Sequence, residues 1–221
     1  MVEPFFVLKF AGDSEEHIEC WTKRVEKGIN QMTNISVVYH SGSGHTKKMA
    51  EAVCAGVESE EGVEAHLLRI VGEDITDGRW KNDEIMAVLD KSAAIIFGSP
   101  TYMGCISGQM KSFLDATTKQ YYSRAWLDKV ASGFTVSSGP SGDKLHALTT
   151  MATCAMQLGM IWVGQDQTPF NDNGINRLSF YFGAAGQATQ EPPEEAPNAE
   201  DKETGRLLGA RVGRITKRLQ G

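Results

Sequence analysis

The sequence has few of the features that mark several large protein classes. Its four cysteines include no Cys-x-x-Cys pair, which argues against a disulfide framework and against a zinc site. No apolar run approaches the roughly 20 residues of a membrane span, and no basic leader precedes a long apolar region at the amino terminus. A net charge of -6 disfavours nucleic acid as a partner. We therefore expect a cytoplasmic protein with no metal site.

Two common phosphate-binding motifs are also missing. The Walker pattern is absent because no Lys-Ser/Thr follows a spaced pair of glycines, and this absence disfavours an ATPase. The dinucleotide fingerprint Gly-x-Gly-x-x-Gly is absent as well. A phosphate group would therefore have to be held by loops of another kind.

The pattern that is present is an alternation of short apolar runs with helix-like stretches. At 221 residues and 41% hydrophobic content the chain suits one domain with a substantial core. The predicted strands are Ile35–His40, Ala65–Ile70, Ser92–Phe97, Val130–Val136 and Ile161–Val163, and the predicted helices span about 45–60, 83–91, 107–117, 143–158 and 200–219. Such alternation predicts a doubly wound, five-stranded parallel α/β sheet of order 2-1-3-4-5 with helices on both faces.

Two segments depart from this alternation. Residues 1–33 precede the predicted domain of residues 34–221, and they are either an accessory helix or the product of an upstream start site. Residues 164–204 form a long segment rich in Asn, Gly, Gln, Pro and Glu. A loop of this length is usually functional or disordered, and the aromatic run Phe180–Gly183 indicates that half of it is ordered.

Three predicted strands end in loops of glycine, serine and threonine: Ser41–Thr46, Ser99–Gly104 and Ser137–Asp143. In an open parallel sheet, loops at the carboxyl ends of the strands converge on one crevice, where ligands bind. The first loop opens a helix, and its glycines and three hydroxyls suit a phosphate group held at a helix N-terminus. An ordinary capped turn explains the same residues equally well.

The second and third loops offer little acid–base chemistry. The second supplies backbone N–H groups, one hydroxyl and large flat or soft side chains, which suit an isoalloxazine ring whose redox chemistry belongs to the cofactor. Alternatively it is a rigid proline turn in which Tyr102 and Met103 pack. The third loop either encloses the other edge of the flavin or caps the next helix through Ser141 or Asp143. Together the three loops favour a flavin.

Three sequence blocks resemble one family. They are Ser41-x-x-Gly44-His45-x-x-x-Met49-Ala50, Gly98-Ser99-Pro100-Thr101-x-x-Gly104 and Ser107-Gly108-Gln109-Met110-x-x-Phe113-Leu114-Asp115. In these blocks the chain is similar to the flavodoxin-like NAD(P)H:quinone oxidoreductases, once named Trp-repressor-binding proteins. The resemblance implies FMN as cofactor, NADH or NADPH as cosubstrate, a small-molecule quinone as acceptor, and a homo-oligomer, either a dimer or a tetramer.

The resemblance also implies site residues. It places FMN contacts on Ser41, Ser43, Gly44, His45, Thr46, Pro100, Thr101, Tyr102, Met103, Gly104, Ser137, Ser138, Gly139 and Gly142. An aromatic of the active-site wall corresponds to Tyr121, and Gln157-Leu158 replaces a histidine pair near the open face of the flavin. Tyr102-Met103 replaces Arg-Phe, and Ser43 replaces an aromatic residue. The flavin itself carries the reaction, and the pocket is expected to be less cationic than in typical relatives.

Two other functions remain compatible with these residues. A flavodoxin-type electron carrier docks redox proteins without substrate turnover of its own, and the acidic charge suits that role. The long segment 164–204 argues against it, because small carriers rarely have such an insertion. A flavin-binding regulatory protein is the third alternative.

Overall fold

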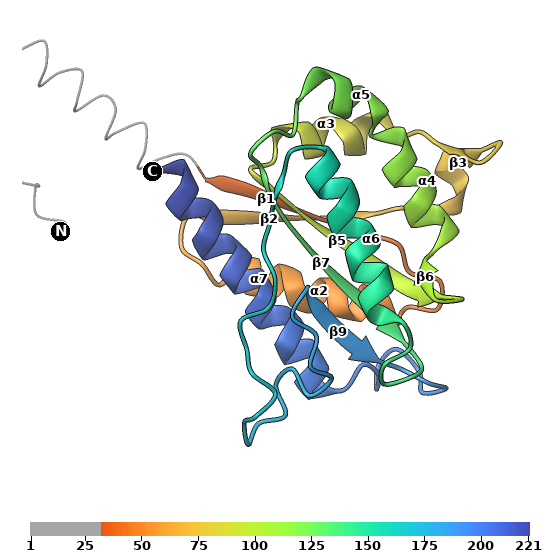
Figure 1. The fold of residues 1–221 in the computed structure, drawn as a ribbon, viewed down its shortest axis with the longest axis vertical. Coiled ribbons are helices and arrows are strands. Elements are labelled where there is room, and N and C mark those ends of the chain that lie inside the picture. The colour runs from red at the N-terminus through yellow and green to blue at the C-terminus, as the bar shows by residue number, and fades with distance from the viewer. Residues whose placement is uncertain (1–31) are drawn as a thin grey trace, which may run out of the picture. The chain divides into compact units, whose positions relative to one another are not determined.

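A parallel β-sheet of order β2-β1-β5-β7-β8 forms the centre of residues 32–221, the part of the chain that this computed structural model describes (Figure 1). Its strands are β1 (Thr33–Tyr39), β2 (Val63–Arg69), β5 (Ala94–Tyr102), β7 (Val130–Ser137) and β8 (Ile161–Trp162). Neighbours on this path pair in parallel. The predicted order 2-1-3-4-5 is confirmed. The accessory helix considered within residues 1–33 lies almost wholly outside the described residues.

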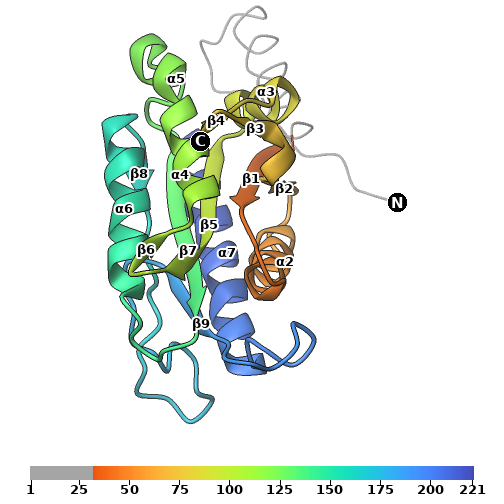
Figure 2. The same cartoon turned by 90° about the vertical axis from the view of Figure 1, so that its right-hand side faces the viewer.

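Helices cover both faces of the sheet (Figure 2). They are α2 (His45–Glu58), α3 (Asp83–Lys91), α4 (Gly108–Ala116), α5 (Thr118–Ser123), α6 (Lys144–Gln157) and α7 (Ala199–Gln220). Because successive strand residues point to opposite faces, Val37 joins the core under α2 and α7, whereas Val38 joins the core under α3, α4 and α6. No helix in residues 32–221 is long and apolar enough to cross a membrane.

The helices α2 and α7 pack backbone to backbone. A Cβ atom at Gly56 would overlap the carbonyl oxygen of Arg206, and one at Gly209 would overlap that of Val53. Glycine is therefore required sterically at both positions, and this contact fixes the position of α2 on the sheet. The site described below begins at the N-terminus of α2.

The fifth strand position is shared by two short strands, a division that the sequence did not predict. β8 pairs with Val130 and Ala131 at the start of β7, and β9 (Ala184–Gln187) pairs with residues 134–137 at its end. Residues 163–183, here called the excursion, connect β8 to β9 and lie outside the sheet. The predicted fifth strand at Ile161–Val163 is confirmed as β8, whereas the prediction of an unbroken loop after it is wrong because β9 lies within residues 164–204.

Two small hairpins were also missed. β3 (Ile75–Thr76) pairs with β4 (Arg79–Trp80), and the end of β5 pairs with β6 (Cys105–Ile106). As a result β5 extends five residues beyond the predicted strand end at Phe97. The second glycine-containing loop is therefore mostly strand, followed by a two-residue turn.

Candidate functional site

The first loop connects β1 to the N-terminus of α2. Gly44 occupies the N-cap position with a φ of 98°, and the first helical turn contains no acidic residue. The Ser41 hydroxyl oxygen accepts hydrogen bonds from the backbone N–H groups of Gly44 at 3.1 Å and Lys47 at 3.2 Å. The N–H groups of His45 and Thr46 have no acceptor within residues 32–221. These free donors at the positive end of a helix dipole fit an anion such as a phosphate group.

The second loop is the hairpin between β5 and β6. Met103 and Gly104 both have positive φ, 45° and 81°, which is the pattern of a type I′ turn. Met103 is fully exposed at its tip, and Tyr102 is 47% exposed beside it. Thr101 is instead buried, and its hydroxyl lies 2.7 Å from that of Thr135 on β7. Its side chain thus bonds within the sheet.

The third loop connects β7 to α6. Asp143 is at the N-cap in the left-handed conformation with a φ of 53°, and neither its side chain nor that of Ser141 caps the helix. The capping alternative for this loop is therefore wrong. Lys144 is fully buried, and its ammonium donates to the carbonyl oxygens of Gly139 and Pro140. Burial lowers the pKa of Lys144 to about 8, although nearby Asp201 opposes this shift.

The three loops meet at one edge of the sheet. The Tyr102 hydroxyl of the second loop lies against Gly42 of the first. A Cβ atom at Gly104 would lie 3.7 Å from the Asp143 carboxylate of the third loop. The side-chain amide of Gln187 on β9 donates to Ser138 at 3.0 Å and links that strand to the same edge. The arrangement offers backbone N–H groups and hydroxyls and few titratable side chains.

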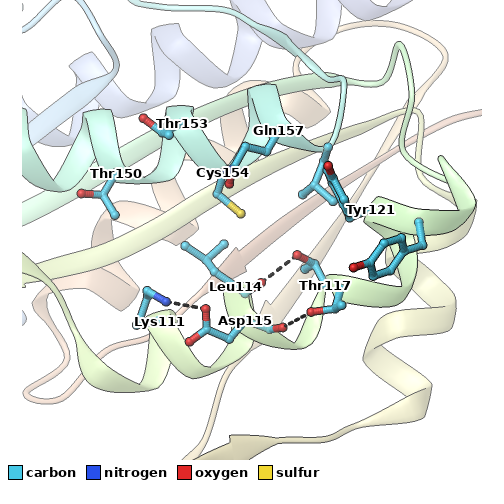
Figure 3. Close-up of a pocket in the computed structure, with 12 residues that line it drawn as sticks. Lys111, Leu114, Asp115, Thr117, Tyr121, Thr150, Thr153, Cys154 and Gln157 are labelled. Carbon is cyan, nitrogen blue, oxygen red and sulfur yellow. Dashed lines mark hydrogen bonds and ion pairs between the residues drawn. The ribbon is translucent and has the colours of Figure 1, made fainter.

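Tyr121 and Gln157 lie in a separate groove between α4, α5 and α6 (Figure 3). The groove has a volume of about 480 Å³ and is lined by Lys111, Leu114, Asp115, Thr117, Thr118, Tyr121, Tyr122, Thr150, Thr153, Cys154, Gln157 and Leu158. Because α6 has 14 residues, Gln157 is about 20 Å along its axis from the third loop. Leu158 is buried there. Within one chain these residues are therefore not brought together with the three loops.

Several residues near the loops carried no recognisable sequence signal. Asp201 is 1% exposed, and its carboxylate accepts two hydrogen bonds from Arg177 at 2.9 Å each. It also accepts one from the backbone N–H of Gln187 at 2.8 Å, so it connects α7 to β9. His40, next to the first loop, is buried, and burial together with Arg69 lowers its pKa. Only the fold brings these distant residues together.

Within residues 32–221 no group of three His, Cys, Asp or Glu residues could hold a metal ion.

Comparison with known proteins gives a consistent family signal. Residues 34–173 match the family model described as NADPH-dependent FMN reductase. The chain is 39% identical over 194 residues to flavodoxin FldP of Pseudomonas aeruginosa, covering 85% of this chain and 99% of that protein. It is 32% identical over 210 residues to NAD(P)H dehydrogenase (quinone) of Geobacter sulfurreducens, covering 85% and 100%. A crystal structure of a flavodoxin, WrbA-like protein from Agrobacterium tumefaciens matches with a TM-score of 0.65 and 39% identity, covering 84% and 98%.

Proposed function

Since the chain belongs to the NADPH-dependent FMN reductase family, we propose that it is an FMN-dependent oxidoreductase that transfers two electrons from NADH or NADPH to a small quinone. The observation that carries this proposal is the meeting of three glycine- and hydroxyl-containing loops at the ends of β1, β5 and β7. Ligands of open α/β sheets bind at this edge, close to the point between β1 and β5 where the strand order reverses direction. Relatives named NAD(P)H dehydrogenase (quinone) support the same reaction.

The residues present fit FMN. The free N–H groups of His45 and Thr46 would bind its phosphate, and the Ser41 hydroxyl, whose oxygen accepts from two backbone N–H groups, keeps its own proton available for a phosphate oxygen. The hairpin at Tyr102 and the loop at Ser137–Gly142 would flank the ring system. When bound, FMN would supply the two-electron redox chemistry between NAD(P)H and the acceptor.

We also propose that the protein acts as a homo-oligomer, either a dimer or a tetramer, in the cytoplasm. Phe170 on the excursion is 91% exposed, and Tyr181 and Phe182 are about half exposed. If these residues form one contiguous apolar patch, it would mark an interaction surface, and closed symmetric assembly is the common arrangement for soluble chains. An oligomer would also let Tyr121 and Gln157 of one chain face the loops of another.

A steady-state assay with NADH or NADPH and benzoquinone tests the proposal. We expect turnover that requires FMN, and the cofactor released on denaturation should be FMN and not FAD. The alternative is a flavodoxin-type electron carrier without turnover of its own, and one relative is named flavodoxin FldP. A protein that binds FMN, exchanges electrons with redox proteins and leaves benzoquinone unreduced would contradict the enzyme and support the carrier.

A further inference from the structure

A short exposed segment lies against the first loop. Residues 189–195, here called the strap, run between Ala188 and Ala196, which belong to the core under α2 and α7 and are 8% and 5% exposed. The backbone N–H of Ala188 donates to Ser137 at 3.2 Å. Both ends of the strap are thus held by the core, and its middle extends to the N-terminus of α2.

Two contacts join the strap to the first loop. The Nε2 atom of His45 lies 2.8 Å from the carbonyl oxygen of Glu191, and because a carbonyl only accepts, Nε2 is the donor. The other ring nitrogen of His45, Nδ1, lies 2.9 Å from the Ser43 hydroxyl. The ring of Pro193 packs on Gly44, where an added Cβ would lie 2.7 Å from the proline Cγ. The N-cap glycine of the phosphate-type helix end is therefore covered by the strap.

The strap is held in shape mainly by its own hydrogen bonds. The Glu191 carboxylate accepts from the backbone N–H of Thr189 at 2.8 Å and from its hydroxyl at 2.6 Å. These bonds lower the pKa of Glu191 to about 2, so the carboxylate stays ionised at neutral pH. A hollow of about 220 Å³ lies between the strap and Arg177. The strap therefore borders open space on the side of Arg177.

We propose that the strap closes the phosphate end of the cofactor site, so that it slows the release of FMN and excludes FAD. The proposal rests on the FMN site proposed above. FMN ends at its phosphate, whereas FAD continues from that phosphate into an AMP group. The Pro193 ring packs on Gly44, and the Glu191 carbonyl oxygen accepts from His45. The strap would therefore block the AMP group of FAD where it leaves the N-terminus of α2. His45 acts as a positioning residue that fastens the strap.

A matched pair of double variants separates this role from general effects on the strap. Glu191→Ala/Pro193→Ala removes the shaping carboxylate and the ring on Gly44. Pro192→Ala/Glu194→Ala makes the same changes at exposed neighbours, which supply neither the hydrogen bond to His45 nor the ring on Gly44. Both variants keep the Glu191 backbone carbonyl that accepts from His45. Thermal melting followed by circular dichroism checks that both variants fold.

Dissociation of FMN is followed by rapid dilution of the loaded protein, and the dissociation constants of FMN and FAD are measured by calorimetry. We expect the first variant to release FMN about tenfold faster and to lose at least tenfold of its preference for FMN over FAD. It loses the two hydrogen bonds from Thr189 to the Glu191 carboxylate and the apolar contact of Pro193 with Gly44. The second variant should behave as wild type. Equal release rates and an unchanged preference in both variants would overturn the strap proposal alone. A wild-type protein that binds neither flavin would overturn the proposed function as well.

Discussion

The hydroxyl oxygen of Tyr102 lies so close to Gly42 that a Cβ atom at position 42 would overlap it. Gly42 lies in the loop after β1, and Tyr102 is the last residue of the neighbouring parallel strand β5. The position of Tyr102 at the candidate site is therefore set by the absence of a side chain on the adjacent loop.

This relationship predicts the effect of Gly42→Ala. The new methyl group should displace the side chain of Tyr102, which is about half exposed, so the free energy of unfolding should change little while FMN binding weakens by about 1 kcal/mol. Tyr102→Phe in the same chain should restore binding, because the next ring atom lies 3.5 Å from the place of the added methyl group, an ordinary contact. A double-mutant cycle on the FMN dissociation constant measures the coupling. Strictly additive effects would contradict the steric explanation.

A second glycine should behave differently because its neighbour is in the core. A Cβ atom at Gly98 would overlap the ring of Phe134, which is fully buried. Gly98→Ala should lower the free energy of unfolding by about 1–3 kcal/mol, the usual cost of overpacking. Gly108→Ala is the control, since an added Cβ there meets open space. Urea denaturation measures both, and an equal loss in the two variants would exclude overpacking as the cause.

The buried Lys144 predicts a pH dependence of stability. Its pKa is lowered to about 8 in the folded protein, below the value of about 10.4 expected when unfolded. Between these values the unfolded chain binds more protons, so the free energy of unfolding should rise with pH, by at most about 1.4 kcal/mol per pH unit. Lys144→Met should remove this contribution. Denaturation at pH 7.5, 9 and 10 tests it, and an unchanged difference between wild type and variant would contradict the prediction.

Discrimination between the two nicotinamide cosubstrates should be weak. Arg177 lines the hollow beside the strap. Its guanidinium donates two hydrogen bonds to the Asp201 carboxylate, each at 2.9 Å. It is therefore not free to bind the additional phosphate of NADPH. We expect kcat/KM for NADH and NADPH to agree within about tenfold. A preference of two orders of magnitude, roughly 2.7 kcal/mol, would contradict the prediction and point to another cation, such as Arg69, which donates to the Ser41 carbonyl oxygen at 3.3 Å.

The order of the sheet could be predicted because its signals are local. Continuous Val/Ile runs mark the buried strands, and the loops after β1, β5 and β7 interrupt them. The β3–β4 hairpin also had a local signal, since Asp77-Gly78 adopts positive φ at both positions, as type I′ turns require. An Asp-Gly dipeptide between the short runs Ile75–Thr76 and Arg79–Trp80 is therefore enough to predict this hairpin from the sequence.

The rest depends on distant contacts. β9 reads Ala-Ala-Gly-Gln, without the branched residues that favour strands, and it is a strand because β7 offers a free edge beside it. Tyr121 and Gln157 were assigned through a family pattern, which gives positions along the chain and not their distance from the loops. The strap at Glu191 and Pro193 lies about 150 residues from Gly44, and no sequence pattern indicates that contact.

The excursion between β8 and β9 begins and ends at the same place. The backbone N–H of Gln165 donates to Tyr181 at 2.9 Å, and the Trp162 indole donates to Phe182 at 2.9 Å. Since its ends are already joined, the length of this segment can change at a small entropic cost while β7 keeps its pairing with both strands. Insertions and exchanges at its exposed part around Phe170 would alter the surface offered to other molecules, while Arg177, which bonds Asp201, keeps its connection to α7. Evolution can therefore vary the associations of this protein separately from its chemistry.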